Sequence, residues 1–173
     1  MFVCNASLAF NLFGLDNRAG IERLKLLPVT GKTILLSKNL AFLMFVSIQV
    51  MPLILLAGWR LGLPLGVFGI VEAAALTAMY LTWGNWMSVN HPFKLQFFQF
   101  SSSNGVVVEA LAGIIFGSLP GLIASYSLHT DGFGAAWKIA LILLFSSLFY
   151  FVSVMHMGVR FAQKQDRISS ALS

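Results

Sequence analysis

The tripeptide Gly31-Lys32-Thr33 has the composition that ends a phosphate-binding loop, in which a lysine and a hydroxyl contact nucleotide phosphates and magnesium. Such a loop also needs a glycine five residues before its Gly-Lys pair, and Leu26 stands at that position. It further needs a buried strand before it, whereas Pro28 precedes this tripeptide and a long apolar run follows it. We therefore predict no ATPase site in this chain.

Two carboxylates, Glu72 and Glu109, lie inside long apolar runs. Ionisable groups within a membrane are costly and often mark a functional site. By helix rise each lies only about 6–8 Å from the nearer end of its run, within reach of lipid headgroups or a neighbouring helix. Two interpretations stay open: a structural or interfacial role, and a place on a substrate path.

Other reactive side chains show no catalytic or metal-binding pattern. His91, His129 and His156 lack the close spacing of metal ligands, and the single Cys4 cannot form an intramolecular disulfide. The sequence also contains no Gly-x-Ser-x-Gly motif and no paired acid. We predict that the chain is not an enzyme and holds no metal or cofactor of its own.

The composition predicts that these residues are positioned by membrane-spanning helices. Hydrophobic residues make up 58% of the chain and charged residues 10%, against about 25% charged in an average soluble domain. Four runs of about 21 residues match the ~30 Å hydrocarbon thickness of a bilayer and are apolar all round. We predict an all-α polytopic membrane protein, a single domain over residues 1–173, with four full spans at residues 39–59, 67–87, 105–126 and 137–157.

Residues 1–13 are apolar but too short to cross a bilayer. They also lack the basic region and small-residue cleavage site of a signal peptide. We expect a partial span, the inner part of a span that begins upstream, with a re-entrant or interfacial helix as the alternative. On the first interpretation the chain is the C-terminal portion of a longer protein, or a gene fragment.

The distribution of basic residues predicts the orientation. Nine of the eleven Lys and Arg residues fall in the loop 14–38, the loop 88–104 and the tail 158–173, while only Arg60 and Lys138 lie on the opposite side. Because basic residues concentrate on the cytoplasmic side, we place the two loops and the C-terminus in the cytoplasm and the protein in the inner (plasma) membrane. The net charge of +5 is thereby explained without a nucleic-acid partner.

The first basic loop contains a short amphipathic pattern. Apolar residues recur every third position and opposite charges have helical spacing, the residues being Arg18, Ile21, Glu22, Leu24, Lys25 and Leu27. Pro28 then ends the turn. The pattern indicates a short helix at the cytoplasmic surface, and amphipathicity alone fits a partner contact and a rest in the lipid headgroups equally well.

Four stretches carry a family resemblance: Phe13-Gly14-Leu15-Asp16, Leu26-Leu27-Pro28, Ile34-Leu35-Leu36-Ser37-Lys38-Asn39, and Gly84-Asn85-Trp86-Met87-Ser88-Val89-Asn90-His91-Pro92. They resemble, in this order, the Phe-Gly-x-Asp motif, the apolar stretch ending in proline, the Ile-Leu-x-x-Lys-Asn start of the third span and the Gly-Asn-x-x-Ser-x-x-x-Pro end of the fourth span of type 2 ABC exporter permeases. The order of the spans extends the resemblance along the chain.

The resemblance implies a permease subunit that moves a substrate by coupling to ATP hydrolysis in a separate subunit. ATP and magnesium would bind that partner, and a second permease copy would complete a homo- or heterodimer. Contact with the ATP-binding subunit would fall on the coupling loop, at Arg18, Ile21, Glu22, Arg23, Leu24, Lys25, Leu27 and Pro28. The alternative is a structural or assembly membrane protein, or a non-functional permease fragment.

Three further patterns lie near the membrane surfaces. Phenylalanines at positions 93, 97 and 100 predict a short helix on the inner leaflet, with contact to the ATP-binding subunit as the alternative. Arg160, Lys164 and Arg167 have the same spacing and predict a basic face suited to anionic lipid, with the same alternative. Gly117, Pro120 and Gly121 interrupt the third span, and the resemblance, through the short broken helices that the family often has before its last span, implies that residues 118–136 fold back into the outer leaflet.

Overall fold

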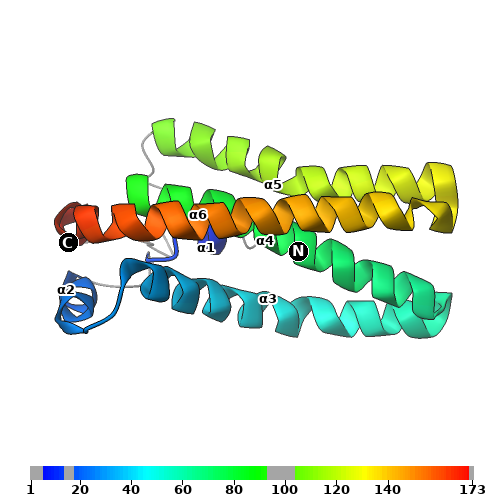
Figure 1. Ribbon diagram of the computed structural model, residues 1–173, viewed down its shortest axis with the longest axis horizontal. Coiled ribbons are helices and arrows are strands. Elements are labelled where there is room, and N and C mark those ends of the chain that lie inside the picture. The colour runs from blue at the N-terminus through cyan, green and yellow to red at the C-terminus, as the bar shows by residue number, and fades with distance from the viewer. Residues whose placement is uncertain (1–5, 14–17, 93–103, 172–173) are drawn as a thin grey trace.

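The computed structural model describes residues 6–13, 18–92 and 104–171. Figure 1 shows that this part of the chain is a bundle of helices. The helices are α1 (Ala6–Ala9), α2 (Arg18–Leu26), α3 (Gly31–Leu61), α4 (Leu63–Asn90), α5 (Asn104–Asp131) and α6 (Ala136–Ala171), with a 3-10 turn, η2 (Gly132–Ala135), between the last two. Within the described residues no strand occurs.

The four long helices α3, α4, α5 and α6 are long and apolar enough to cross a membrane. At most a third of the most apolar stretch of each helix is buried inside the bundle. The remainder is an outer surface of large apolar side chains, such as Ile48 and Leu55 on α3 and Ile115 on α5, which water would solvate poorly. The predicted all-α polytopic membrane protein is confirmed, and each predicted span lies within one of these helices.

The helices extend beyond the predicted spans. The side chain of Thr30 caps α3 by accepting a hydrogen bond from the Thr33 N–H at 3.3 Å, so the loop predicted to run to residue 38 ends at Thr30. At the other end of α3 the predicted loop 60–66 is reduced to a turn at Gly62, whose φ of 103° favours glycine. The point at which a helix ends depends on its caps and its backbone hydrogen bonds, and not on how apolar its side chains are. Hydropathy therefore does not predict the ends of these helices.

One prediction for the later part of the chain is wrong. The expected fold-back of residues 118–136 does not occur, because α5 continues through Pro120 and bends along its length rather than breaking (Figure 1). The predicted tail is a continuation of α6, which runs on to Ala171. The short helix predicted around residues 93–100 lies outside the described residues.

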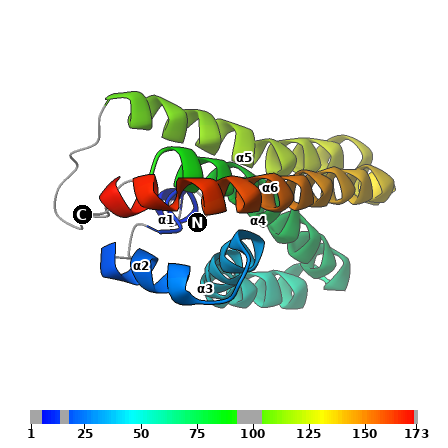
Figure 2. The ribbon, with the colours of Figure 1, turned by 60° about the vertical axis from the view of Figure 1, so that its left-hand side comes forward.

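Helices α4 and α6 form the centre of the bundle, with α3 and α5 on either side of them (Figures 1 and 2). One end of the bundle, called here the α2 end, holds α2, the start of α3, the end of α4, the start of α5 and the last turns of α6. The Gly62 turn and η2 lie at the opposite end, called the Gly62 end. The segments that connect the predicted spans therefore lie at the two ends of the bundle.

Glycines allow two close approaches of the backbone at the α2 end. A Cβ placed on Gly31 of α3 would lie 2.2 Å from the carbonyl oxygen of Gly158 on α6. A Cβ on Gly84 of α4 would lie 2.0 Å from the carbonyl oxygen of Ala9. Small residues of this kind let membrane helices approach closely and gain dispersion contacts.

We predict that Gly31→Ala lowers the free energy of unfolding by about 1–3 kcal/mol, because the added methyl group forces α3 away from α6. The matched control is Gly58→Ala in the same helix, where the new Cβ meets its nearest neighbour at an ordinary 3.4 Å. Unfolding of the purified protein by SDS, followed by tryptophan fluorescence, measures both. Equal stability of the two variants would contradict a close crossing at Gly31.

Candidate functional site at the α2 end

Helix α2 is fixed to the bundle by its apolar edge. Ile21 is completely buried in a cluster that includes Phe161 and Ile168 of α6, and Leu24 packs against the same cluster. Glu22 and Arg23 are exposed on the helix. The side chains of Arg18 and Lys25, also predicted for this site, lie outside what the structure describes. The predicted amphipathic helix is thus present, with its apolar edge turned toward its own chain.

The apolar residues that remain accessible lie at the end of α2 and in the turn after it. Leu26 is 83% exposed, Leu27 51% and Val29 44%, and Pro28 between them is also exposed. Of the apolar contacts predicted for a partner, Leu27 is available, whereas Ile21 and Leu24 are covered by α6. The spacing of residues along the sequence identifies an apolar edge of a helix, but it does not identify the element that packs against that edge. Here that element is the extension of α6, which the sequence did not reveal.

The segment before α2 is held by the motif at the end of α4. The backbone N–H of Leu12 donates to the Ser88 Oγ at 2.9 Å, and Gly84 leaves room for the carbonyl of Ala9. Phe10 is buried and stacks on Tyr80 of α4, with 5.8 Å between ring centroids. The Gly-Asn-x-x-Ser motif therefore anchors residues 9–12 inside the bundle.

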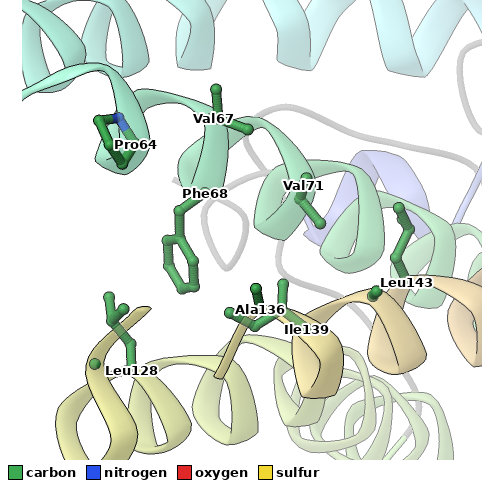
Figure 3. A pocket seen from close by; sticks show the side chains of 10 residues that line it. Pro64, Val67, Phe68, Val71, Leu128, Ala136, Ile139 and Leu143 are labelled. Atoms are coloured by element: carbon green, nitrogen blue, oxygen red, sulfur yellow. The ribbon is translucent and has the colours of Figure 1, made fainter. Parts of the chain in front are cut away.

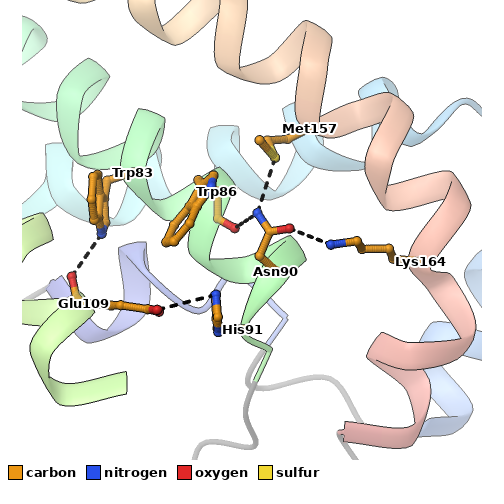
Figure 4. Close-up of polar contacts among 7 residues, drawn as sticks. All are labelled: Trp83, Trp86, Asn90, His91, Glu109, Met157 and Lys164. Carbon is orange, nitrogen blue, oxygen red and sulfur yellow. Dashed lines mark hydrogen bonds and ion pairs between the residues drawn. The ribbon is translucent and has the colours of Figure 1, made fainter. Parts of the chain in front are cut away.

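Asn90 joins α4 to α6 at the same end (Figure 4). Its Nδ2 donates to the backbone oxygen of Trp86 at 2.9 Å and lies 3.9 Å from the Met157 Sδ. Its Oδ1 accepts a hydrogen bond from the Lys164 Nζ at 2.6 Å. Lys164 therefore points into the bundle, so the basic face predicted for Arg160, Lys164 and Arg167 is wrong for its middle member.

Glu109 joins α5 to α4. One carboxylate oxygen, Oε1, lies 3.5 Å from the His91 Nε2, and the backbone oxygen of Glu109 accepts a hydrogen bond from the Trp83 indole at 3.2 Å (Figure 4). Both of these side chains are about one third exposed. This arrangement favours the structural interpretation of Glu109. Trp83 of α4 also packs against Phe116 of α5, with 5.6 Å between ring centroids.

The start of α3 is tied to α6 and to the segment before α2. Phe13 stacks on Phe161 with 4.9 Å between centroids, and the Lys38 Nζ lies 5.7 Å from the centre of the Phe13 ring. Asn39 donates from its Nδ2 to the Tyr150 hydroxyl at 3.2 Å. The Lys-Asn pair that carries the resemblance is thus placed beside both α6 and the N-terminal segment.

Glu72 lies toward the Gly62 end and does not meet Glu109. Its Oε1 accepts a hydrogen bond from Ser125 on α5 at 3.4 Å and lies beside Gly121. Gly121 is about 18 Å along α5 from Glu109 by helix rise. The two predicted path residues are therefore separate, and each is bound to a neighbouring helix.

An apolar cavity of about 240 Å³ lies near the Gly62 end between α4, α5 and α6 (Figure 3). Phe68 and Val71 of α4 face Leu128 and Ile139 across it. Neither Glu72 nor Glu109 lines this cavity. Its chemistry suits an apolar group and offers no side-chain carboxylate or amine to orient a polar one.

Comparison with known proteins adds no further constraint on the site. No protein-family model matches the chain. Searches of curated proteins and of solved structures gave no match either. The chain is an all-α, multi-pass membrane protein, and several of the polar contacts between its helices lie at the α2 end.

Proposed function

We propose that this chain is the membrane-spanning permease subunit of an ABC exporter, driven by ATP hydrolysis in a separate subunit that binds the ATP and magnesium. The observation that carries the proposal is the construction of α2. This helix is anchored to the spans by Ile21, and it presents charged side chains together with the exposed apolar residues Leu26 and Leu27 at one end of the bundle. The motif resemblance supports it.

The packing of α2 suits the transmission of force. Ile21 belongs to one apolar cluster with Leu35 of α3 and Phe161 of α6. Because protein cores are close-packed, a displacement of α2 by a partner would move the ends of both spans together. The spans would then switch between two orientations that bind the substrate differently, as transport requires. A second permease copy would supply the other wall of the path.

The distribution of basic residues supports an orientation of the protein in the membrane. Arg23, Lys32, Arg160 and Arg167 belong to the α2 end, whereas Arg60 and Lys138 belong to the Gly62 end. The α2 end, with the C-terminus, would face the cytoplasm, where an ATP-binding subunit can reach it, and the protein would lie in the inner (plasma) membrane.

The orientation can be tested with single cysteines introduced into a Cys4→Ser background. Gly134→Cys in η2 and Ser170→Cys near the end of α6 are both at exposed positions. We expect a membrane-impermeant maleimide to label Gly134→Cys on intact cells and Ser170→Cys only after permeabilisation. The reverse pattern would place the α2 end outside and would contradict the proposed coupling.

The coupling contact can be tested with Leu26→Asp. We expect co-purification of the ATP-binding subunit to fall roughly tenfold or more, because an apolar contact worth about 1–3 kcal/mol is lost and a charge is buried. Arg23→Ala should have a much smaller effect, since exposed ion pairs contribute little.

Leu63→Asp is the matched control, because it puts the same charge on an exposed leucine at the Gly62 end. Leu24→Asp is unsuitable, since Leu24 packs against the bundle and its change tests folding. Should Leu26→Asp keep both its partner and substrate-stimulated ATP hydrolysis, α2 rests on lipid and the permease proposal fails in favour of a structural or assembly role.

A further inference from the structure

A groove of about 730 Å³ lies between the start of α3 and the stretch 151–163 of α6, toward the α2 end. Its lining becomes more polar along α6. Phe151, Val152 and Met155 come first, on the side nearer the middle of the membrane, and His156, Arg160 and Gln163 follow, with Val159 among them. The groove is therefore apolar at membrane depth and polar where the helix leaves the apolar region.

The polar part of the groove carries positive charge from two helices. Arg160 of α6 is exposed, and Lys32 of α3 is half-buried beside it in the lining. No carboxylate is present among the described residues that line the groove. Lys164, the other nearby cation on α6, is already bound to Asn90 and points elsewhere.

The close crossing of α3 and α6 places these two cations on the same groove. The missing side chain of Gly158 leaves space that is occupied by Lys32, and Arg160 follows two residues later. An anion bound in the groove would be attracted by both charges. Lys32 also belongs to the first turn of α3, where the helix dipole adds positive potential.

We propose that this groove binds an anionic phospholipid of the bilayer. The phosphate lies between Lys32 and Arg160, since lysine and arginine both bind phosphate and arginine can do so through two hydrogen bonds. His156 and Gln163 offer further polar contacts to the headgroup. An acyl chain covers Phe151, Val152 and Met155, whose side chains are 41–61% exposed in the bundle. Basic pockets between membrane helices are known to bind acidic lipid headgroups.

The inference rests on the fold and on membrane insertion, and it is independent of the permease proposal. Charge complementarity selects a lipid over an apolar protein helix, because the groove joins an apolar floor to a cationic mouth. A soluble phosphate compound would satisfy the mouth but would leave the floor uncovered.

The test uses the full chain purified in a mild detergent and titrated with phosphatidylglycerol, with binding counted by native mass spectrometry. Phosphatidylcholine with the same acyl chains and glycerol phosphate serve as separate probes. Two variants disable the groove: the double change Lys32→Gln and Arg160→Gln removes its charge, and Val159→Trp fills it without changing charge. The control double change Arg23→Gln and Arg167→Gln removes two exposed cations of the same end outside the groove.

We expect phosphatidylglycerol to bind at least about tenfold more tightly than phosphatidylcholine. The Lys32→Gln and Arg160→Gln change should weaken phosphatidylglycerol binding roughly thirtyfold. This is the combined loss expected when two basic residues are removed and each contributes as much as a basic residue does near an anionic lipid surface. Val159→Trp should also weaken it, and the control pair should change it by less than about threefold.

Equal losses in the groove pair and the control pair would show a general surface attraction and overturn the site. Unchanged binding in Val159→Trp would remove the acyl chain from the groove. Glycerol phosphate that displaces phosphatidylglycerol at equal concentration would mean that a free phosphate compound, and not a lipid, is the ligand. An unchanged SDS unfolding profile of each variant establishes that a loss of binding is not a loss of fold.

Discussion

Exclusion of water cannot hold these helices together inside a bilayer, because lipid tails are as apolar as the side chains that face them. Close backbone contact and buried polar contacts must do so instead. The contacts of Gly31 with Gly158 and of Gly84 with Ala9 are demanding cases, since at each glycine one added methyl group would meet a carbonyl oxygen. Near the contact of Gly31 with Gly158 lie the capped start of α3, the buried Ile21 and the groove lined by Lys32 and Arg160.

Polar contacts join different helices at both ends of the bundle. Toward the α2 end, α4 is bonded to α6 through Asn90 and Lys164 and to α5 through His91 and Glu109. Toward the Gly62 end, Ser125 of α5 donates to Glu72 of α4, and Lys138 of α6 pairs with Asp131 of α5. The apolar cavity lies between the same helices. Polar contacts in a low-dielectric region resist separation more strongly than dispersion alone. The polar contacts at the α2 end therefore help to hold α4 against both α5 and α6.

Much of the fold could be predicted from the sequence. Apolar length and the absence of a one-sided stripe identified the four membrane helices, because a bilayer imposes both requirements directly. The existence of α2 also followed from local spacing. The helix ends could not be predicted from hydropathy, since a threonine cap extends α3 and α6 continues through polar residues.

The candidate site was predictable only in part. Ile21 and Leu24 were identified as an apolar edge, but their cover by α6 depends on contacts between distant parts of the chain. Lys164 was placed on a basic face by spacing, whereas its bond to Asn90 turns it inward. Lys32 was considered only as part of a phosphate-binding motif, which the sequence does not complete. Its place on the same groove as Arg160 results from the crossing of α3 and α6, which no local sequence pattern predicts.

The stacking of Phe13 on Phe161 has a consequence for biogenesis. Phe161 lies in the last helix, so the pocket for Phe13 is complete only after α6 has been synthesised and inserted. During translation the N-terminal segment therefore cannot dock until α6 is in place. Contacts between residues so far apart in the sequence form slowly. Its docking closes the bundle, and a ribosome that stalls before α6 leaves an uncovered aromatic segment, the kind of surface that cellular quality control recognises.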